Sequence, residues 1–117
     1  MAEPFRDWVH VSAFALALPE TELSTSYGKP AVKVRSKAFL YPGREQGSFA
    51  VASPLPEKEL LIETDPATFW ETDHYRGWPA VLIRYDSAER ERIETVIQRA
   101  WWDRAGKAQR VAFGERP

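Results

Sequence analysis

The sequence predicts a two-layer α+β domain in which an antiparallel sheet of about five strands carries its helices on one face. Near both ends of the chain, apolar residues recur at spacings of three and four, which is typical of amphipathic helices. In the middle they alternate with polar residues, which is typical of half-buried strands. The expected order, α-β-β-β-α-β-β-α, has short connections and no regular alternation of strand and helix. We therefore expect antiparallel pairing rather than a doubly wound parallel sheet.

The first helix is expected over residues 5–18. Five apolar residues share one of its faces: Phe5, Trp8, Val11, Ala15 and Leu18. Proline suits a first helical turn and disfavours helical geometry in the residue before it, so Pro4 and Pro19 mark the two ends. Residues 19–30 are polar and turn-prone, and they read as a connecting segment.

Three strands are expected next: residues 31–35, 38–41 and 49–53. The first alternates two valines with Lys33 and Arg35, so these two cations are expected to point the same way. Ser36 and Lys37 form a short polar connection that suits a hairpin, and residues 42–47 form a longer turn. Connections of this kind place the three strands side by side in an antiparallel sheet.

The second half of the chain is expected to hold two helices and one or two strands. The elements are a helix over 56–64, a strand or helical turn over 67–71, a strand over 79–85 and a closing helix from 86 onward. Asp86 and Glu89 have the spacing of a capping box, and Gly106 is well placed to end the closing helix. Residues 111–113 are read as a final packed segment or strand.

Length and composition favour a single cytoplasmic domain over residues 1–117. The chain is 44% hydrophobic, and its five Trp, six Phe and four Tyr favour a core rich in rings. It has no cysteine, which excludes disulfides, thiolate nucleophiles and thiolate metal sites. We find neither a signal peptide nor a run of about 20 apolar residues, so we expect no membrane partner. We also expect no metal and no cofactor.

Three local patterns resemble the MmcQ/YjbR family in their order and spacing. They are Leu18-Pro19-Glu20 with Tyr27-Gly28-Lys29-Pro30, the stretch from Val32 to Phe39, and Gly77-Trp78 before a strand, an acidic cap and a long helix. The resemblance covers roughly residues 8–113 and implies a CyaY-like sheet with helices on one side. It also implies DNA binding by a double wing of sheet and loops, and it brings no catalytic residues. Trp101 and Trp102 depart from the family, whose members often have Ser-Tyr there.

Eight residues are our candidates for contacting nucleic acid. They are Lys29, Lys33, Arg35, Lys37, Arg44, Arg76, Trp78 and Arg84. Cations contact phosphates, and arginine and tryptophan planes stack on unpaired bases. We therefore expect a non-catalytic domain that binds DNA through a sheet face and its loops. The net charge of −1 argues against a dedicated nucleic-acid binder, and a solvated sheet face is the plainer interpretation of the cations.

The main alternative is a protein-interaction or homodimer module without a nucleic-acid role. Trp78 or Trp102 would anchor it, although we expect Trp78 to fold back into the core and Trp102 to serve as structural cover. The carboxylates clustered between residues 57 and 73 are read as surface charge, or as an acidic side that orients a partner. An enzyme is not expected, because neither His10 nor His74 has a metal-ligand or nucleophile partner at a recognised spacing.

Overall fold

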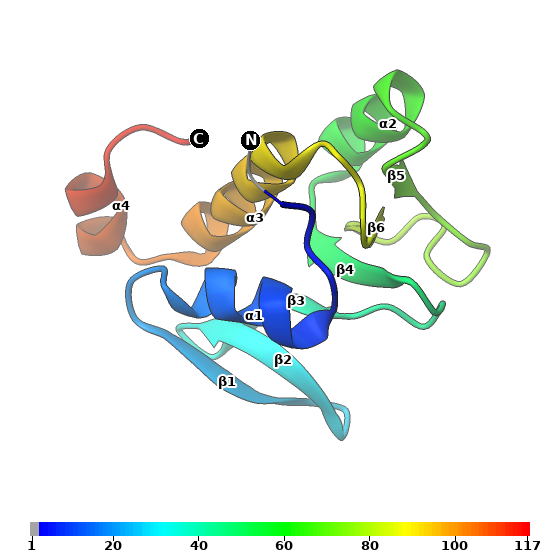
Figure 1. The fold of residues 1–117 in the computed structure, drawn as a ribbon. Helices are drawn as coiled ribbons and strands as arrows, with labels where there is room; N and C mark the ends of the chain where they lie inside the picture. The colour runs from blue at the N-terminus through cyan, green and yellow to red at the C-terminus, as the bar shows by residue number, and fades with distance from the viewer. Residues whose placement is uncertain (1–2) are drawn as a thin grey trace.

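The computed structural model describes residues 3–117, and this part of the chain holds six strands and four helices (Figure 1). In chain order they are α1 (Trp8–Leu16), β1 (Thr21–Ser26), β2 (Lys29–Val34), β3 (Lys37–Pro42), β4 (Ser48–Ala52), α2 (Leu55–Thr64), β5 (Phe69–Trp70), β6 (Ala80–Arg84), α3 (Arg90–Arg104) and α4 (Lys107–Phe113). Every strand pair is antiparallel, and the sheet order is β1-β2-β3-β4-β6-β5. The predicted α+β class is confirmed.

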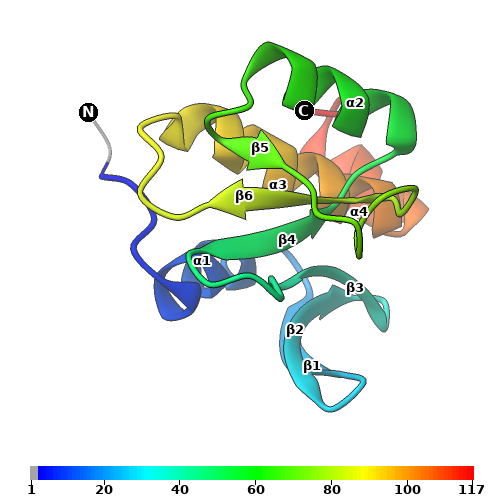
Figure 2. The ribbon, with the colours of Figure 1, turned by 90° about the vertical axis from the view of Figure 1, so that its right-hand side faces the viewer.

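Helices α1, α2 and α3 pack on one face of the sheet, and the main core lies between them and the strands (Figures 1 and 2). Strand alternation supplies the sheet side of this core: Phe49 and Val51 of β4 face Ile83 and Val81 of β6, and all four are fully buried. From the helices come residues such as Trp101 of α3, whose indole N–H donates to the Pro19 carbonyl at 2.9 Å. None of the helices in residues 3–117 is long and apolar enough to cross a membrane.

Strand β1 lies in the segment 19–30, which the sequence predicts to be a connection. It pairs with β2 from Thr21 opposite Val34 to Ser26 opposite Lys29. Tyr27 and Gly28 close the hairpin with φ angles of 52° and 78°, the positive values that tight two-residue hairpin turns require. As a largely exposed edge strand, β1 has a polar sequence with a single large apolar side chain, so it carries no alternation signal. The sheet consequently has six strands rather than about five.

Strand β3 contains a bulge. Val32 lies opposite Leu40 and Lys33 lies opposite Ala38, so Phe39 has no partner of its own on β2. An extra residue of this kind breaks strict alternation and bends the strand. Phe39 and Leu40 are accordingly both fully buried, although neighbours on a regular strand point to opposite faces.

The closing helix begins later than predicted. Asp86 has a φ of 67°, and its carboxylate makes no capping hydrogen bond. The Ser87 hydroxyl instead accepts the backbone N–H of Glu89 at 3.2 Å, and helical geometry starts at Arg90. The predicted capping box at Asp86 is therefore wrong, because the chain turns through a left-handed residue before it enters α3.

The end of the chain is helical rather than extended. Gly106 does not end α3 but begins α4, where its N–H donates to the Gln109 side chain at 2.7 Å. The segment 111–113 is the last turn of α4, and the Phe113 ring lies 5.0 Å from the buried Trp101 ring. Trp102 is half-buried and donates to the Gly114 carbonyl at 3.3 Å, so the covering role expected for it is fulfilled within this chain.

Candidate functional site

The face of the sheet that carries no helix holds a second, smaller apolar cluster. Ala50, Ala80 and Leu82 point to this side from β4 and β6. The segment 71–79, which joins β5 to β6, folds over them and inserts Tyr75, which is 6% exposed. The Tyr75 hydroxyl accepts the backbone N–H of Arg44 at 3.3 Å. This part of the face is therefore covered by the chain itself and is not a solvated cationic surface.

Lys58 of α2 holds the 71–79 segment in place. Its side chain is 1% exposed, and its ammonium donates to the carbonyls of Tyr75 at 2.7 Å and Trp78 at 2.9 Å. The Glu71 carboxylate lies 3.2 Å from the same nitrogen. A buried ammonium is tolerated only when such partners replace its water shell, so these three contacts explain its burial. They tie both ends and the middle of the segment to α2.

Trp78 is exposed beside a histidine and an arginine. Its side chain is 61% exposed, and the His74 ring stacks on it at 6.3 Å between centroids and 16° between planes. Arg44, in the β3–β4 turn, places Nη1 2.9 Å from Nδ1 of His74. We call Arg44, His74 and Trp78 the Trp78 surface. The expectation that Trp78 folds into the core is wrong, because Tyr75 takes the buried position in this segment.

Two further candidate arginines, Arg76 in the same segment and Arg84 of β6, already have partners in the chain. Arg76 lies 2.8 Å from the Asp73 carboxylate and 3.8 Å from that of Glu71. Arg84 of β6 stacks on the Trp70 ring with 4.4 Å from its guanidinium carbon to the ring centroid. Its buried Nη1 has no hydrogen-bond partner among the described residues. Neither side chain offers a charge as available as that of Arg44.

The remaining four candidates belong to the β2–β3 hairpin and are not gathered into one group. Lys29 is exposed at the start of β2, whereas Lys37 is exposed opposite Val34 at its end, so the two are about 17 Å apart by strand geometry. Lys33 is half-buried and lies opposite Glu22. Arg35 does not point the same way as Lys33, because it belongs to the turn, with a φ of 52°. Its aliphatic stem lies beside Gly106, at the junction of α3 and α4.

Lys58, Tyr75 and His74 belong to the site, but the sequence does not predict them as site residues. A signal for Lys58 was present, because it stands three and four positions before Leu61 and Ile62, on the inward face of α2. Its acidic neighbours made it look like a surface residue. No comparable signal marks His74 and Tyr75, since their roles depend on how a loop without periodicity folds over the sheet.

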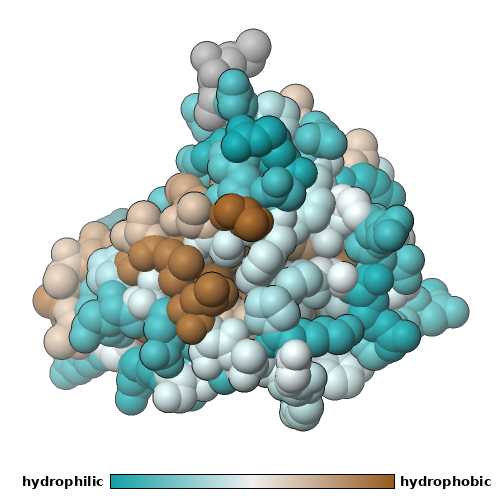
Figure 3. Space-filling model, turned by 60° about the horizontal axis from the view of Figure 1, so that its bottom comes forward, coloured by the Kyte–Doolittle hydropathy of each residue, from teal (hydrophilic) through white to brown (hydrophobic). Residues whose placement is uncertain are grey.

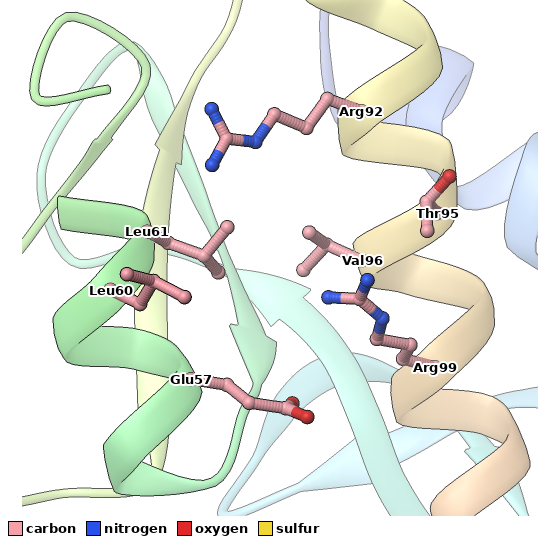
Figure 4. A pocket seen from close by; sticks show the side chains of 7 residues that line it. All are labelled: Glu57, Leu60, Leu61, Arg92, Thr95, Val96 and Arg99. Atoms are coloured by element: carbon pink, nitrogen blue, oxygen red, sulfur yellow. The ribbon is translucent and has the colours of Figure 1, made fainter. Parts of the chain in front are cut away.

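A separate cavity of about 170 Å³ lies between α2 and α3 (Figure 4). Leu60, Leu61 and Val96 form its apolar part, and Arg92 and Arg99 stand at its two ends. Arg92 donates to the Thr64 hydroxyl at 2.7 Å, and Arg99 donates through Nε to the Pro117 carbonyl at 2.7 Å. The arginines of this cavity are thus already bound to groups of the same chain.

Glu57, at the wall of this cavity, belongs to a junction between the chain end and two helices. Arg116 binds Glu57 of α2 at 2.6 Å and Asp103 of α3 at 2.8 Å. The hydrogen bonds from Arg116 lower the pKa of Glu57, and those to Asp103 and Glu57 raise the pKa of Arg116. Within residues 3–117, no three His, Asp or Glu side chains are grouped to hold a metal ion.

Comparison with known proteins identifies the family. A family model described as YjbR matches residues 16–102. One uncharacterized protein of Mycobacterium bovis and two of Mycobacterium tuberculosis are each 38% identical to this chain over 56 residues. That match spans 48% of this chain and 43% of each relative, so it covers less than half of their length.

A solved structure shows the same fold. The crystal structure of Deinococcus radiodurans protein DR2400, with a DUF419 domain, matches with a TM-score of 0.71 over 94% of this chain and 89% of that one. The two sequences are 14% identical, so the likeness concerns the fold alone. The YjbR match extends from the end of α1 through most of α3, which is well over half of the sequence. The chain belongs to the YjbR family.

Proposed function

We propose that this chain is a non-catalytic domain that binds nucleic acid at the Trp78 surface, with unpaired bases stacking on the indole of Trp78. The observation that carries the proposal is the 61% exposure of Trp78 in a segment whose backbone is fixed by the buried Lys58. Exposed aromatic rings on a fixed backbone are platforms for bases, and each stacked base contributes about 1–3 kcal/mol. Arg44 makes no ion pair with any carboxylate of residues 3–117, so its guanidinium can meet a phosphate.

Single strands suit this surface better than duplexes. Duplex affinity comes mainly from many cations that neutralise phosphates, and it rises with each additional contact. Here Lys29 and Lys37 lie apart, Arg76 is neutralised by Asp73, and the whole chain has a net charge of −1. Two stacked rings and one guanidinium favour bases that are already unstacked, so the expected ligand is single-stranded DNA or RNA.

The test is fluorescence polarisation with labelled single-stranded and duplex oligonucleotides at low and moderate salt. Trp78→Ala is expected to weaken single-strand binding about tenfold, since the loss of one stacking partner costs about 1–3 kcal/mol. Tyr27→Asn is the matched control: Tyr27 is fully exposed in the β1–β2 turn, and asparagine tolerates its positive φ. Its affinity should equal that of wild type.

Two results would contradict the proposal. One is the absence of single-strand binding to the wild type at low salt. The other is an equal effect of Trp78→Ala and Tyr27→Asn, because binding would then not depend on the Trp78 surface. A preference for duplex over single strand would retain nucleic-acid binding but reject stacking as its basis.

A further inference from the structure

Helix α1 is apolar on its outer side as well as on its inner side. Residues 8–18 contain no Asp, Glu, Lys or Arg. Val11 and Ala15 are fully buried against the sheet, whereas Val9 is 74% and Leu16 37% exposed on the other side. A helix that is hydrophobic on all sides is normally buried on all sides. The outer side of α1 is apolar but exposed to solvent, so no other part of the described chain packs on it.

Strand β1 extends this exposed apolar surface. The Thr21 hydroxyl donates to the carbonyls of Leu16 at 3.2 Å and Leu18 at 2.9 Å, which places the start of β1 beneath the end of α1. Leu23 stands two residues further on the same side of the strand and is 58% exposed. With the exposed Ala13 and Ala17 of α1, the residues Val9, Leu16 and Leu23 form what we call the α1 patch.

Figure 3 shows apolar side chains gathered on the face that comes forward when the lower side of the molecule, with α1 and β1, turns toward the viewer. Hydrophilic side chains lie above and below them, and paler apolar side chains continue on the left side of this view. A contiguous apolar area with a polar rim is the usual mark of a protein contact, whereas single exposed apolar residues are ordinary. The Trp78 surface does not include any residue of this patch, so the two surfaces can act independently.

The ends of the α1 patch are acidic. Glu3 and Asp7 stand at its N-terminal end. Two arginines lie there as well, but Arg6 is paired with Glu3 at 3.3 Å, and Arg90, which donates to the Glu3 carbonyl, is paired with Glu94 at 2.8 Å. Glu20 is exposed at its C-terminal end. Asp7 and Glu20 form no ion pair within residues 3–117, so an unpaired carboxylate stands at each end of an uncharged centre. A second copy of the chain would bring the same acidic ends, in either orientation of the two helices, so the charges oppose a homodimer here.

We infer that the α1 patch is a docking site for a basic amphipathic helix of a partner protein. Helix-in-groove recognition reads apolar side chains at positions i, i+3 or i+4, and i+7. Val9 and Leu16 are seven residues apart, about 10.5 Å along the helix, which matches that spacing. Lysine or arginine side chains at both ends of the partner's apolar stripe would then meet Asp7 and Glu20.

The probe is a synthetic helical peptide of about 15 residues with leucines at this spacing and lysines elsewhere, compared with a counterpart in which glutamate replaces lysine. Its binding is measured by fluorescence anisotropy. The leucine–lysine peptide should bind wild type at least about tenfold more tightly than the leucine–glutamate peptide, because only the former complements the acidic ends. Trp78→Ala should leave this affinity unchanged, which separates the inference from the proposed nucleic-acid function.

The deciding variants are Val9→Gln, alone and together with Leu16→Gln, since glutamine is a good helix former of suitable size. Each removes part of the apolar contact, and the double variant should lose at least about tenfold in affinity. Val111→Gln is the matched control, because Val111 of α4 is also 74% exposed but lies outside the α1 patch. Val9→Gln alone keeps the test valid if the double variant unfolds.

The inference is overturned if Val9→Gln binds the leucine–lysine peptide as wild type does, or if Val111→Gln weakens binding equally. It is also overturned if both peptides bind with the same affinity, since charge would then play no part. Sedimentation tests the remaining alternative. If wild type is a dimer and Val9→Gln is a monomer, a second copy of the chain occupies the patch, and the inference is overturned.

Discussion

Replacing Lys58 by methionine is expected to destabilise the domain and to release the 71–79 segment. Methionine retains a long apolar stem and removes only the ammonium and its contacts. Those contacts are the hydrogen bonds to the carbonyls of Tyr75 and Trp78 and the ion pair with Glu71. The segment then remains attached to the sheet through the buried Tyr75 ring and its own backbone turns.

The magnitude follows from two opposing terms. Hydrogen bonds from a charged donor contribute about 1.5–3 kcal/mol each, so the two carbonyl bonds together contribute about 3–6 kcal/mol. The variant no longer has to remove an ammonium from water, which offsets several kcal/mol of that loss. Each carbonyl also keeps one backbone donor, the N–H of Trp78 at 3.0 Å and of Ala80 at 2.8 Å. We expect a net loss of about 2 kcal/mol in the free energy of unfolding.

Urea unfolding followed by tryptophan fluorescence measures this loss, and Lys37→Met is the matched control. Lys37 is exposed at the start of β3 and has no ion pair within residues 3–117, so its replacement should change stability by less than about 0.5 kcal/mol. Amide hydrogen exchange adds a local measurement. The N–H groups of Trp78 and Ala80 should exchange faster in Lys58→Met, and single-strand affinity should fall although the Trp78 surface itself is untouched.

A loss in Lys58→Met no larger than in Lys37→Met would refute this reasoning. It would mean that desolvation of the ammonium cancels its hydrogen bonds and that Tyr75 alone positions the segment. Unchanged exchange at Trp78 and Ala80 would lead to the same conclusion.

Two further predictions concern pH. Hydrogen bonds from Arg116 hold the pKa of Glu57 below its ordinary value of 4.5, so the stability that the pair contributes is complete above that pH and is lost as pH falls. The urea midpoint of wild type should therefore drop more between about pH 5 and pH 3 than that of Arg116→Gln, and parallel drops would exclude the effect. Burial raises the pKa of Tyr85 from 10.0 to about 12, so stability is expected to decline as pH rises through that interval. Tyr85→Phe should remove part of the alkaline decline, and identical profiles of the two proteins would contradict this.

The elements that could be predicted from the sequence are those whose apolar residues repeat. Strand β2 and helices α1 and α3 repeat their apolar residues with a period of two or about 3.6, whereas β4 and β6 are buried on both faces and stand out as short, mostly apolar runs. Strand β1 is not predicted from the sequence because an edge strand needs few apolar residues, and α4 is not predicted because none of its residues is buried. The sequence predicts that Gly106 ends α3, whereas in the structure Gly106 caps the start of α4.

The candidate site was predictable only in part. Arg76 and Trp78 follow one another closely in sequence, so their proximity needed no tertiary information. Lys33 and Arg35 were expected on one face, but the hairpin turn begins at Arg35, one residue earlier than predicted, and the alternation ends there. The approach of Arg44 to His74 and of Lys58 to the 71–79 segment joins residues 13 to 30 positions apart. No local pattern encodes such contacts, because they depend on the path of a loop.

The limit of the YjbR match is not the limit of the folded unit. The match ends at Trp102, yet Phe113 packs on the Trp101 ring, and Arg116 fastens the chain end to α2. A fragment that ended where the family similarity ends would lack Phe113 and Arg116. The Trp101 ring would then be exposed on one face, and the Glu57 carboxylate would lose the guanidinium that pairs with it. For related chains, the end of a fragment should therefore be chosen so that it includes the C-terminal side chains that contact the helices, rather than at the point where a sequence alignment ends.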